Sequence, residues 1–324
     1  MQCFDAEATR RALPYPALIE ALRARFAAGC EVPQRHVHSL PAADGAPAGT
    51  VLIMPAWVPG GRLGIKTVNV FPGNAARGLP ALHATYALFD AATGVPLAQL
   101  DGSELTTRRT VAASALAASF LARTEARTLL VVGAGRLARE VPWAMREVRP
   151  GLATVRVWNH RFERAQALAS EWRAQGLDAE PVAELEPAVR AADIVSCVTL
   201  STAPLVRGAW LPAGAHLDLV GGFTPQMREC DGQALRRARV WIDTPEALAK
   251  AGDLLQAVDE GAFDPAATQG TLADLCAGRV GGRRDADELT LFKSVGTALE
   301  DLAAAELAYD SGTLSSLPAH PAPQ

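Results

Sequence analysis

The chain has 324 residues, of which 49% are hydrophobic and 20% charged, enough to bury a sizeable core in one large or two medium domains. A formal net charge of −4 without a basic block argues against a nucleic-acid partner, and no apolar run approaches the length of a membrane span. The five cysteines are scattered without a C-x-x-C pair, so we expect reduced thiols in a cytoplasmic protein, with neither a disulfide framework nor a zinc site.

The first third of the chain predicts a helical start followed by a sheet. Residues 5–28 carry apolar side chains at helical spacing, and Pro14 and Pro16 are expected to separate the first turn or two of this helix. From Pro33 to about Leu100 the pattern changes to short runs with high β-propensity: QRHVHSL, TVLIMPAW, RLGIKTVNVF, HATYALFD and VPLAQLD. The DAATG segment (Asp90–Gly94) predicts a hairpin turn between the last two. Successive strands without intervening helices predict a mostly antiparallel sheet.

The rest of the chain alternates between strands and helices, which predicts a parallel, doubly wound sheet. Thr106 or Thr107 is expected to cap a helix, TRRTVAASALAASFLA, that leads to the strand at Thr128. Further expected strands are TVRVWN, AEPV, DIVSCVTL, AHLDLVGG and RVWIDT, with helices over 162–175 and 185–192. We expect a loop over 270–290, one long helix over 289–312 and a frayed tail from Ser315.

The strand at Thr128 runs directly into a glycine turn, TLLVVGAGRLA, with the spacing G-x-G-x-x-A. Gly133 permits the tight turn, Gly135 lets the backbone approach a pyrophosphate, and Ala138 keeps the following helix close to the strand. The free N–H groups of that helix face the anion, with Ala134, Arg136 and Leu137 completing the turn. The pattern predicts a Rossmann-type dinucleotide site.

The end of the second strand of this fold favours NADP(H) over NAD(H). NAD-binding proteins place an acidic residue there to bind the ribose 2′-hydroxyl. Here the chain reads Trp158, Asn159, His160, Arg161, with Arg164 nearby and no carboxylate. A 2′-phosphate would be attracted to these cations, while NAD(H) and a solvated helix start remain the alternatives.

Several segments together resemble the ornithine cyclodeaminase/μ-crystallin family. The segments are RLGIKTVNVFPGN, LDGSELTTRRTVAASALA, VVGAGRLA, VTLSTAPLV and LFKSVGTALEDLAAAELAYD, in the same order from about residue 33 to 312. The resemblance implies a homodimer and a discontinuous α+β domain for substrate binding and dimerisation, residues 1–122 and 292–324. The dinucleotide-binding α/β domain would then be residues 123–291.

The resemblance also assigns roles to single residues. Lys66 alone reads equally well as a solvent-facing strand residue, but in the family pattern it is an active-site lysine that contacts substrate and passes a proton. Arg35 and Arg109 match positions that bind the substrate's α-carboxylate, a task that suits the planar guanidinium fork. Further positions implied to line the cofactor are Thr85, Thr110, Thr199, Val220 and Ser294. Leu137 departs from the glutamine usual in the family at that place in the turn.

The largest departures concern acidic residues. Where cyclodeaminases carry a Glu and an Asp, this chain has Leu52 and Phe223, neither of which can accept a proton or pair with an ammonium group. Asp218 is a candidate substitute whose direction the sequence leaves open. His36 and His38 have a spacing that can chelate, but without a third ligand we expect no metal.

The resulting hypothesis is an NAD(P)H-dependent oxidoreductase that transfers hydride to or from a small α-imino or amino acid. Two alternatives stay open: a true ornithine cyclodeaminase that recycles NAD internally, and a non-catalytic dinucleotide-binding protein. The sequence does not identify the substrate side chain or the physiological direction.

Overall fold

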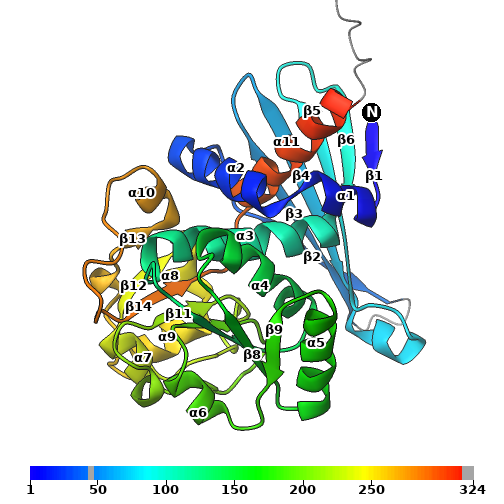
Figure 1. The fold of residues 1–324 in the computed structure, drawn as a ribbon. Helices are drawn as coiled ribbons and strands as arrows, with labels where there is room; N and C mark the ends of the chain where they lie inside the picture. The colour runs from blue at the N-terminus through cyan, green and yellow to red at the C-terminus, as the bar shows by residue number, and fades with distance from the viewer. Residues whose placement is uncertain (43–46, 316–324) are drawn as a thin grey trace, which may run out of the picture. The chain divides into compact units, whose positions relative to one another are not determined.

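The computed structural model describes residues 1–42 and 47–315. Packing separates them into two units: one runs from Met1 to Arg109 and resumes at Ala298, and the other spans Thr110–Thr297. In Figure 1 the red C-terminal helix α11 (Ala298–Ser315) belongs to the same unit as the blue N-terminal helices. The domain limits expected at residues 122 and 291 stay predictions, and the tail expected beyond Ser315 lies outside the described residues.

The first unit is built on one sheet of six strands, in the order β1-β6-β5-β4-β3-β2. The strands are β1 (Gln2–Phe4), β2 (His36–Pro41), β3 (Pro47–Trp57), β4 (Arg62–Val70), β5 (Leu82–Asp90) and β6 (Pro96–Asp101). All neighbours pair antiparallel except β1 with β6, which confirms the mostly antiparallel sheet. The hairpin at Asp90–Gly94 is also confirmed, because Asp90 Oδ1 accepts hydrogen bonds from the Ala92 and Thr93 N–H groups, at 3.0 and 2.8 Å. The short strand β1 was not expected, since three residues are too few to show an alternating pattern.

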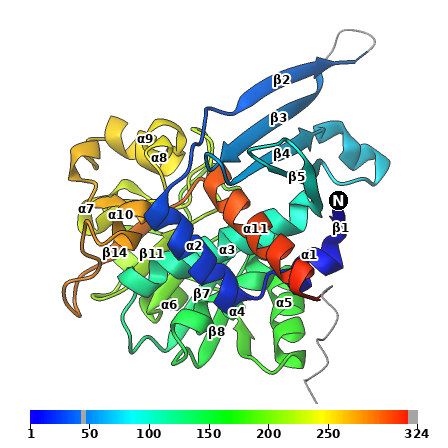
Figure 2. The ribbon, with the colours of Figure 1, turned by 90° about the horizontal axis from the view of Figure 1, so that it is seen from above.

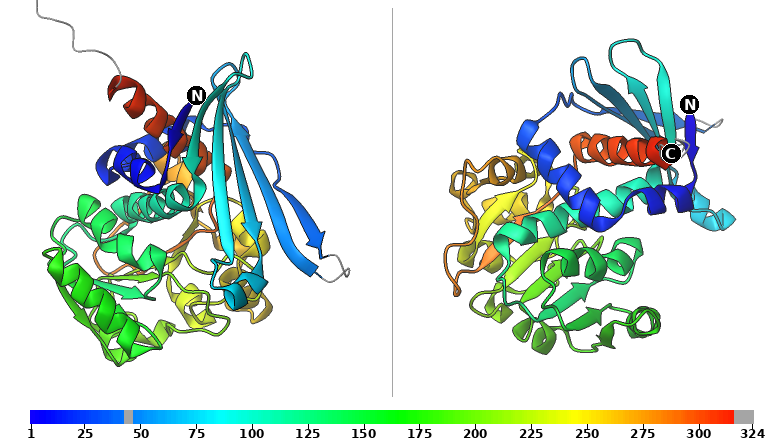
Figure 3. Two further views of the ribbon diagram at one scale, coloured as in Figure 1. Left: turned by 90° about the vertical axis from the view of Figure 1, so that its right-hand side faces the viewer. Right: turned by 45° about the horizontal axis from the view of Figure 1, so that its top comes forward.

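Two helices lie between β1 and β2 in the chain and are separated as the prolines predicted: α1 (Ala6–Ala12) and α2 (Tyr15–Ala28). The buried side of α2 includes Leu18, Leu22 and Phe26. Figures 2 and 3 show that α11 (red) lies beside α2 (blue) in this unit, and a 3-10 turn, η1 (Pro72–Arg77), connects β4 to β5. The C-terminal helix therefore completes the core that the N-terminal segment begins.

The helix α3 (Gly102–Leu121) begins earlier than expected. The prediction that Thr106 or Thr107 caps it is wrong: the Asp101 side chain at the end of β6 accepts a hydrogen bond from the Glu104 N–H at 2.7 Å. Thr107 lies inside the helix, where its hydroxyl donates to the Ser103 carbonyl. An aspartate that ends a strand caps the helix without an intervening loop.

The second unit contains a sheet of eight parallel strands in the order β13-β12-β14-β11-β10-β7-β8-β9. The strands are β7 (Thr128–Val132), β8 (Thr154–Trp158), β9 (Asp178–Pro181), β10 (Ile194–Cys197), β11 (His216–Leu219), β12 (Arg239–Ile242), β13 (Gly270–Thr271) and β14 (Thr290–Lys293). The order reverses at β7, with β8 on one side and β10 on the other, which confirms the doubly wound arrangement. Every residue of β10, β11 and β14 is buried, as expected of the central strands of a parallel sheet covered on both faces, although a few of their side chains are polar.

The connecting helices of this unit are mostly short. They are α4 (Arg136–Val148), α5 (Phe162–Ala174), α6 (Leu185–Arg190), α7 (Gly232–Arg237), α8 (Glu246–Lys250), α9 (Gly252–Asp259) and α10 (Leu272–Cys276), with 3-10 turns η2 (Gly208–Trp210) and η3 (Pro265–Ala267). Over the described ranges, no helix is both long and apolar enough to cross a bilayer.

Two expectations near the C-terminus are wrong. The segment 270–290 contains β13 and α10, and the expected long helix over 289–312 begins with strand β14. All four residues of β14 are buried between β11 and β12, so hydrogen bonding inside the sheet prevails over the helical spacing that starts downstream.

Candidate active site

Four buried charged side chains form one cluster in the first unit. Lys66 Nζ on β4 lies 2.6 Å from Asp301 Oδ2 on α11, and Arg109 Nε on α3 lies 2.9 Å from Asp301 Oδ1. Arg109 also pairs with Glu300. None of the four is more than 5% exposed. Two cations and two carboxylates balance, which is how charges are retained in a protein interior.

The direction of Lys66 follows from the register of β4. Gly64 and Lys66 are buried while Ile65 and Thr67 between and beyond them are only half-buried, so Lys66 faces the side of the sheet that packs against α11. Burial lowers the pKa of Lys66 to about 8, although Asp301 opposes the shift. The solvent-facing alternative for Lys66 is therefore wrong.

The Asp301 carboxylate of this cluster stays ionised. Burial of Asp301 opposes ionisation, but Arg109 and Lys66 together hold its pKa below its usual value. Asp301 bridges the two cations and fixes the separation of their charged ends. Sequence reasoning missed both Glu300 and Asp301, because acidic residues in the first turn of a helix are common for stability alone.

Two further candidates in the first unit, Arg35 and Thr85, lie apart from this cluster on the sheet. Arg35 directly precedes β2 and is half-buried, and β3 lies between β2 and the strand that carries Lys66. Thr85 on β5 pairs with Thr67, so its side chain is on the face of the sheet opposite to Lys66. Thr110 is the residue after Arg109 on α3 and is buried, but it belongs to the second unit.

The glycine turn of the second unit has room for an anion. Gly133 has φ +122°, and a Cβ there would lie 3.0 Å from the Val198 carbonyl oxygen, so the turn requires glycine. Gly135 is the N-cap of α4 without a side-chain cap, and a Cβ built on it meets no described atom within 4 Å. Ala138 is fully buried against the core. The exposed backbone N–H groups of this helix start fit the pyrophosphate of a dinucleotide.

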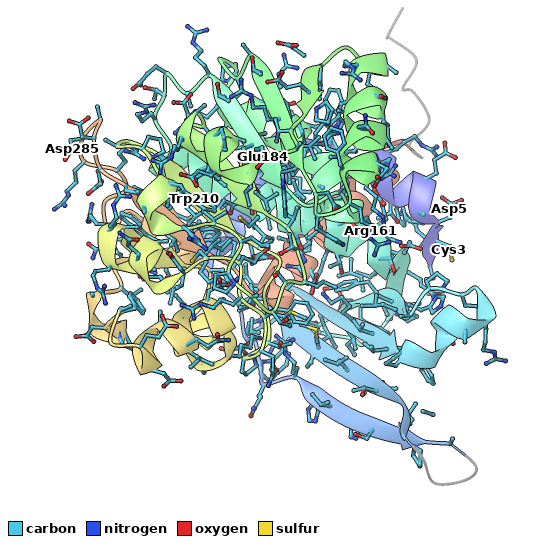
Figure 4. The ribbon with its side chains drawn as sticks, turned by 90° about the horizontal axis from the view of Figure 1, so that it is seen from below. Cys3, Asp5, Arg161, Glu184, Trp210 and Asp285 are labelled. Carbon is cyan, nitrogen blue, oxygen red and sulfur yellow. The ribbon has the colours of Figure 1, made fainter. Side chains whose placement is uncertain are left out.

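The segment after β8 presents a guanidinium and an imidazole to solvent. Asn159 is largely buried, and its Oδ1 accepts from the Arg161 N–H at 3.3 Å. Arg161 Nε lies 3.2 Å from His160 Nε2, and both side chains are exposed at the start of α5, where Figure 4 labels Arg161. These groups can bind an added phosphate on the ribose.

The remaining cofactor candidates follow the carboxyl ends of three strands, where doubly wound sheets bind ligands. Thr199 comes after β10, Val220 after β11 and Ser294 after β14. The Ser294 hydroxyl donates to Asp243 Oδ2 at 3.2 Å, and both the N–H and the hydroxyl of Thr199 donate to Glu229. Sequence reasoning did not identify Glu229.

Asp218 does not take over the role of the carboxylates that the family pattern has at Leu52 and Phe223. Leu52 is half-buried on β3 and Phe223 is 48% exposed in the loop after β11. Asp218 is fully buried, and the hydroxyls of Ser196 and Ser114 donate to it at 2.7 and 3.1 Å. The proposal that Asp218 substitutes for a catalytic carboxylate is wrong, because its side chain points into the core between β10 and α3.

The histidines of β2 stack on each other, with ring centroids 6.5 Å apart. Within the ranges that the structure describes, no group of three or more His, Cys, Asp and Glu side chains is placed to hold a metal ion.

Comparisons with known proteins agree on one family. The model of the ornithine cyclodeaminase/mu-crystallin family matches residues 5–315. The delta(1)-pyrroline-2-carboxylate reductase of Paracoccus denitrificans is 39% identical over 275 residues, 83% of this chain and 87% of that protein. The Thermococcus litoralis delta(1)-pyrroline-2-carboxylate reductase, solved with NADH and L-proline, matches with a TM-score of 0.89 at 30% identity, over 98% of this chain and 99% of that one. An archaeal alanine dehydrogenase dimer with bound NAD has a TM-score of 0.89 at 27% identity, over 98% and 97%.

Proposed function

Because the chain belongs to the ornithine cyclodeaminase/mu-crystallin family, we propose that it is an NAD(P)H-dependent oxidoreductase acting on the C=N bond of a small α-imino acid, or in reverse on the amino acid. The observation that carries the proposal is the buried pair Lys66 and Arg109, held by Asp301 in one unit, in a chain whose other unit has an open dinucleotide turn. We favour cyclic imino acids as the substrate class.

We assign the binding of the substrate carboxylate to Arg109 and Lys66. Arg35 precedes β2, two strands away from the strand of Lys66, and its role as a third cation stays a prediction of the family resemblance. A guanidinium offers paired N–H donors that match a carboxylate, and burial strengthens the attraction. The reaction forms one C–H bond and one N–H bond while the C=N bond becomes single. When bound, the reduced nicotinamide supplies the hydride for the carbon. Lys66 supplies the proton for the nitrogen, because a lysine with a pKa of about 8 is still protonated at neutral pH yet releases its proton readily.

Chain connectivity supports joint action of the two units. Arg109 and Thr110 are consecutive on α3, and the boundary between the units falls between them. The chain returns from the second unit to the first after Thr297, between the cofactor candidate Ser294 and the Glu300–Asp301 pair. Both crossings are thus flanked by a cofactor candidate on one side and a substrate-site residue on the other.

We assign the cofactor preference to NADP(H). Solved relatives contain NADH or NAD. In this chain the exposed Arg161 and His160 follow β8 where NAD-selective proteins carry an acidic residue. A carboxylate there would repel a 2′-phosphate, while a guanidinium binds it with charge-assisted hydrogen bonds.

The edge strand β2 and the cysteines bear on assembly and location. All six residues of edge strand β2 are exposed, including Val37 at 57% and Leu40 at 37%, and such an edge favours pairing with a second copy. We therefore propose a homodimer formed through this sheet. The five cysteines are all free thiols, which suits the reducing cytoplasm.

The test is oxidation of NADPH and NADH with a panel of substrates: delta(1)-pyrroline-2-carboxylate, its six-membered homologue, and α-keto acids with an amine. We expect turnover with at least one cyclic imine, and loss of turnover in Lys66→Met. Cofactor binding without turnover of any substrate would favour the non-catalytic alternative. Ammonia release from ornithine without a net change in cofactor absorbance would favour the cyclodeaminase, against which Leu52 and Phe223 argue.

A further inference from the structure

A second buried charged cluster lies in the dinucleotide-binding unit, and none of the roles above uses it. It consists of Glu229 before α7, Asp253 at the start of α9 and Lys293 at the end of β14, all with 0% exposure. Lys293 Nζ lies 2.9 Å from Asp253 Oδ2 and 4.0 Å from Glu229 Oε2. Burying three charges is costly, so their arrangement calls for a purpose beyond solubility.

Glu229 joins the two segments that follow neighbouring strands. Its Oε1 accepts from the N–H and hydroxyl of Thr199, at 2.7 and 2.8 Å, in the segment after β10. Its Oε2 accepts from the N–H groups of Gly221 and Gly222, at 2.9 and 3.1 Å, in the segment after β11. Three of the four partners are backbone N–H groups, which can only donate, so the Glu229 carboxyl group acts as an acceptor towards both segments.

We call the Glu229 carboxylate, with its contacts to Thr199, Gly221 and Gly222, the clamp. The two backbone segments that it joins approach each other closely. A Cβ on Gly221 would lie 2.0 Å from the Thr199 carbonyl oxygen and 2.6 Å from Glu229 Oε1. The close approach of the two segments therefore requires glycine at this position. Asp253 fixes the backbone that carries the Glu229 side chain, because its Oδ1 accepts hydrogen bonds from the N–H groups of Glu229 and Cys230 at 2.7 and 3.1 Å.

These two segments lie where the nicotinamide half of a dinucleotide is expected. In a doubly wound sheet the two mononucleotide halves bind on opposite sides of the point where the strand order reverses. The exposed cations after β8 mark the adenosine half on one side of β7, so the other half lies over β10 and β11.

We propose that Glu229 is a positioning residue: its carboxylate ties the segment of Thr199 to that of Gly221 and Gly222 and so holds the platform for the nicotinamide end of the cofactor. The proposal rests on the dinucleotide site of the proposed function. Burial and the charge of Asp253 raise the pKa of Glu229, whereas Lys293 lowers that pKa and so favours the ionised carboxylate. Asp253 instead orients the residue by accepting a hydrogen bond from its backbone N–H.

The experiment compares two ligands on Glu229→Gln. A glutamine offers one acceptor and one donor, so one of the two segments loses its contacts. The dissociation constants of NADPH and of 2′-phospho-ADP-ribose, which lacks only the nicotinamide, are measured by titration. We expect NADPH to bind at least about tenfold more weakly and the nicotinamide-free ligand to change less than about twofold, from the loss of one or two charge-assisted hydrogen bonds. Equal weakening of both ligands, or of neither, would overturn the proposal.

Hydrogen exchange measured without any ligand separates this proposal from the proposed function. In Glu229→Gln the amides of 198–203 and 220–224 should exchange faster, while those of the glycine turn at 133–136 keep their rates. Asp218→Asn removes a buried carboxylate from the same sheet that does not contact these segments, and should leave both the exchange and the NADPH affinity unchanged. If the wild-type protein binds neither ligand, the dinucleotide site itself is wrong; if it binds both and exchange is unaltered in the variant, the clamp alone is wrong.

Discussion

Asp301 Oδ2 on the last helix lies 2.6 Å from Lys66 Nζ on the central strand of the first sheet, so the candidate active site joins the two ends of the chain. The contact explains why α11 returns to the N-terminal unit with its acidic first turn directed inward. The α11 helix supplies the two carboxylates that pair with the buried cations Lys66 and Arg109.

A double-mutant cycle on this pair should show strong coupling. Asp301→Asn leaves Lys66 and Arg109 facing Glu300 alone, and Lys66→Met leaves an excess carboxylate; each should lower the free energy of unfolding by about 3–5 kcal/mol. The double variant restores charge balance through the remaining Arg109–Glu300 pair, so it should be more stable than either single variant. Denaturant unfolding measures all three, and strictly additive losses would contradict the charge-balance argument.

The pH dependence of imine reduction should follow Lys66. Below a pKa of about 8 the lysine carries the proton that the product nitrogen needs, and above it the lysine is neutral. The kcat/KM for reduction should therefore fall about tenfold per pH unit above pH 8, and the oxidation of the amino acid should rise over the same range. Asp301 raises the pKa of Lys66, so Asp301→Asn should move the alkaline limb to lower pH. A limb that stays in place in this variant would assign the proton to another group.

Removing the guanidinium of Arg161 should affect the binding of NADPH much more than the binding of NADH. Arg161→Ala should weaken the binding of NADPH by about tenfold or more, because a charge-assisted hydrogen bond contributes about 1.5–3 kcal/mol. The affinity for NADH should change by less than about twofold. Arg146→Ala, which removes the same charge from the exposed last turn of α4, is the matched control and should affect neither. Equal weakening of both cofactors would refute the assignment of the 2′-phosphate.

The sequence predicted the parts of the fold that local pattern determines. Strands β2 to β6, the break between α1 and α2 and the parallel sheet around the glycine turn all follow from periodicity and turn residues. The pattern did not predict β14, because its apolar residues continue without a break towards the helical spacing of α11. Only its neighbours β11 and β12, distant in the chain, determine that it is a strand.

The candidate site was predictable only in part, for a similar reason. Lys66 and Arg109 stand in recognisable segments, but their partners Glu300 and Asp301 lie almost 200 positions beyond Arg109, and pairing across such a separation leaves no local signal. The direction of Asp218 was equally undetermined, since a strand buried on both faces gives no alternation of burial to orient it.

The exposed edge strand β2 offers a matched test of the homodimer. Val37 on β2 and Val95 before β6 belong to the same unit and are 57% and 54% exposed, yet β2 ends the sheet while β6 is covered by β1. Val37→Glu would bury a carboxylate in the proposed interface, whereas Val95→Glu would leave it in water. Light scattering coupled to gel filtration should therefore give a dimer for the wild-type protein and Val95→Glu and a monomer for Val37→Glu. A wild-type monomer, or a Val37→Glu dimer as stable as the others, would contradict an interface at this edge.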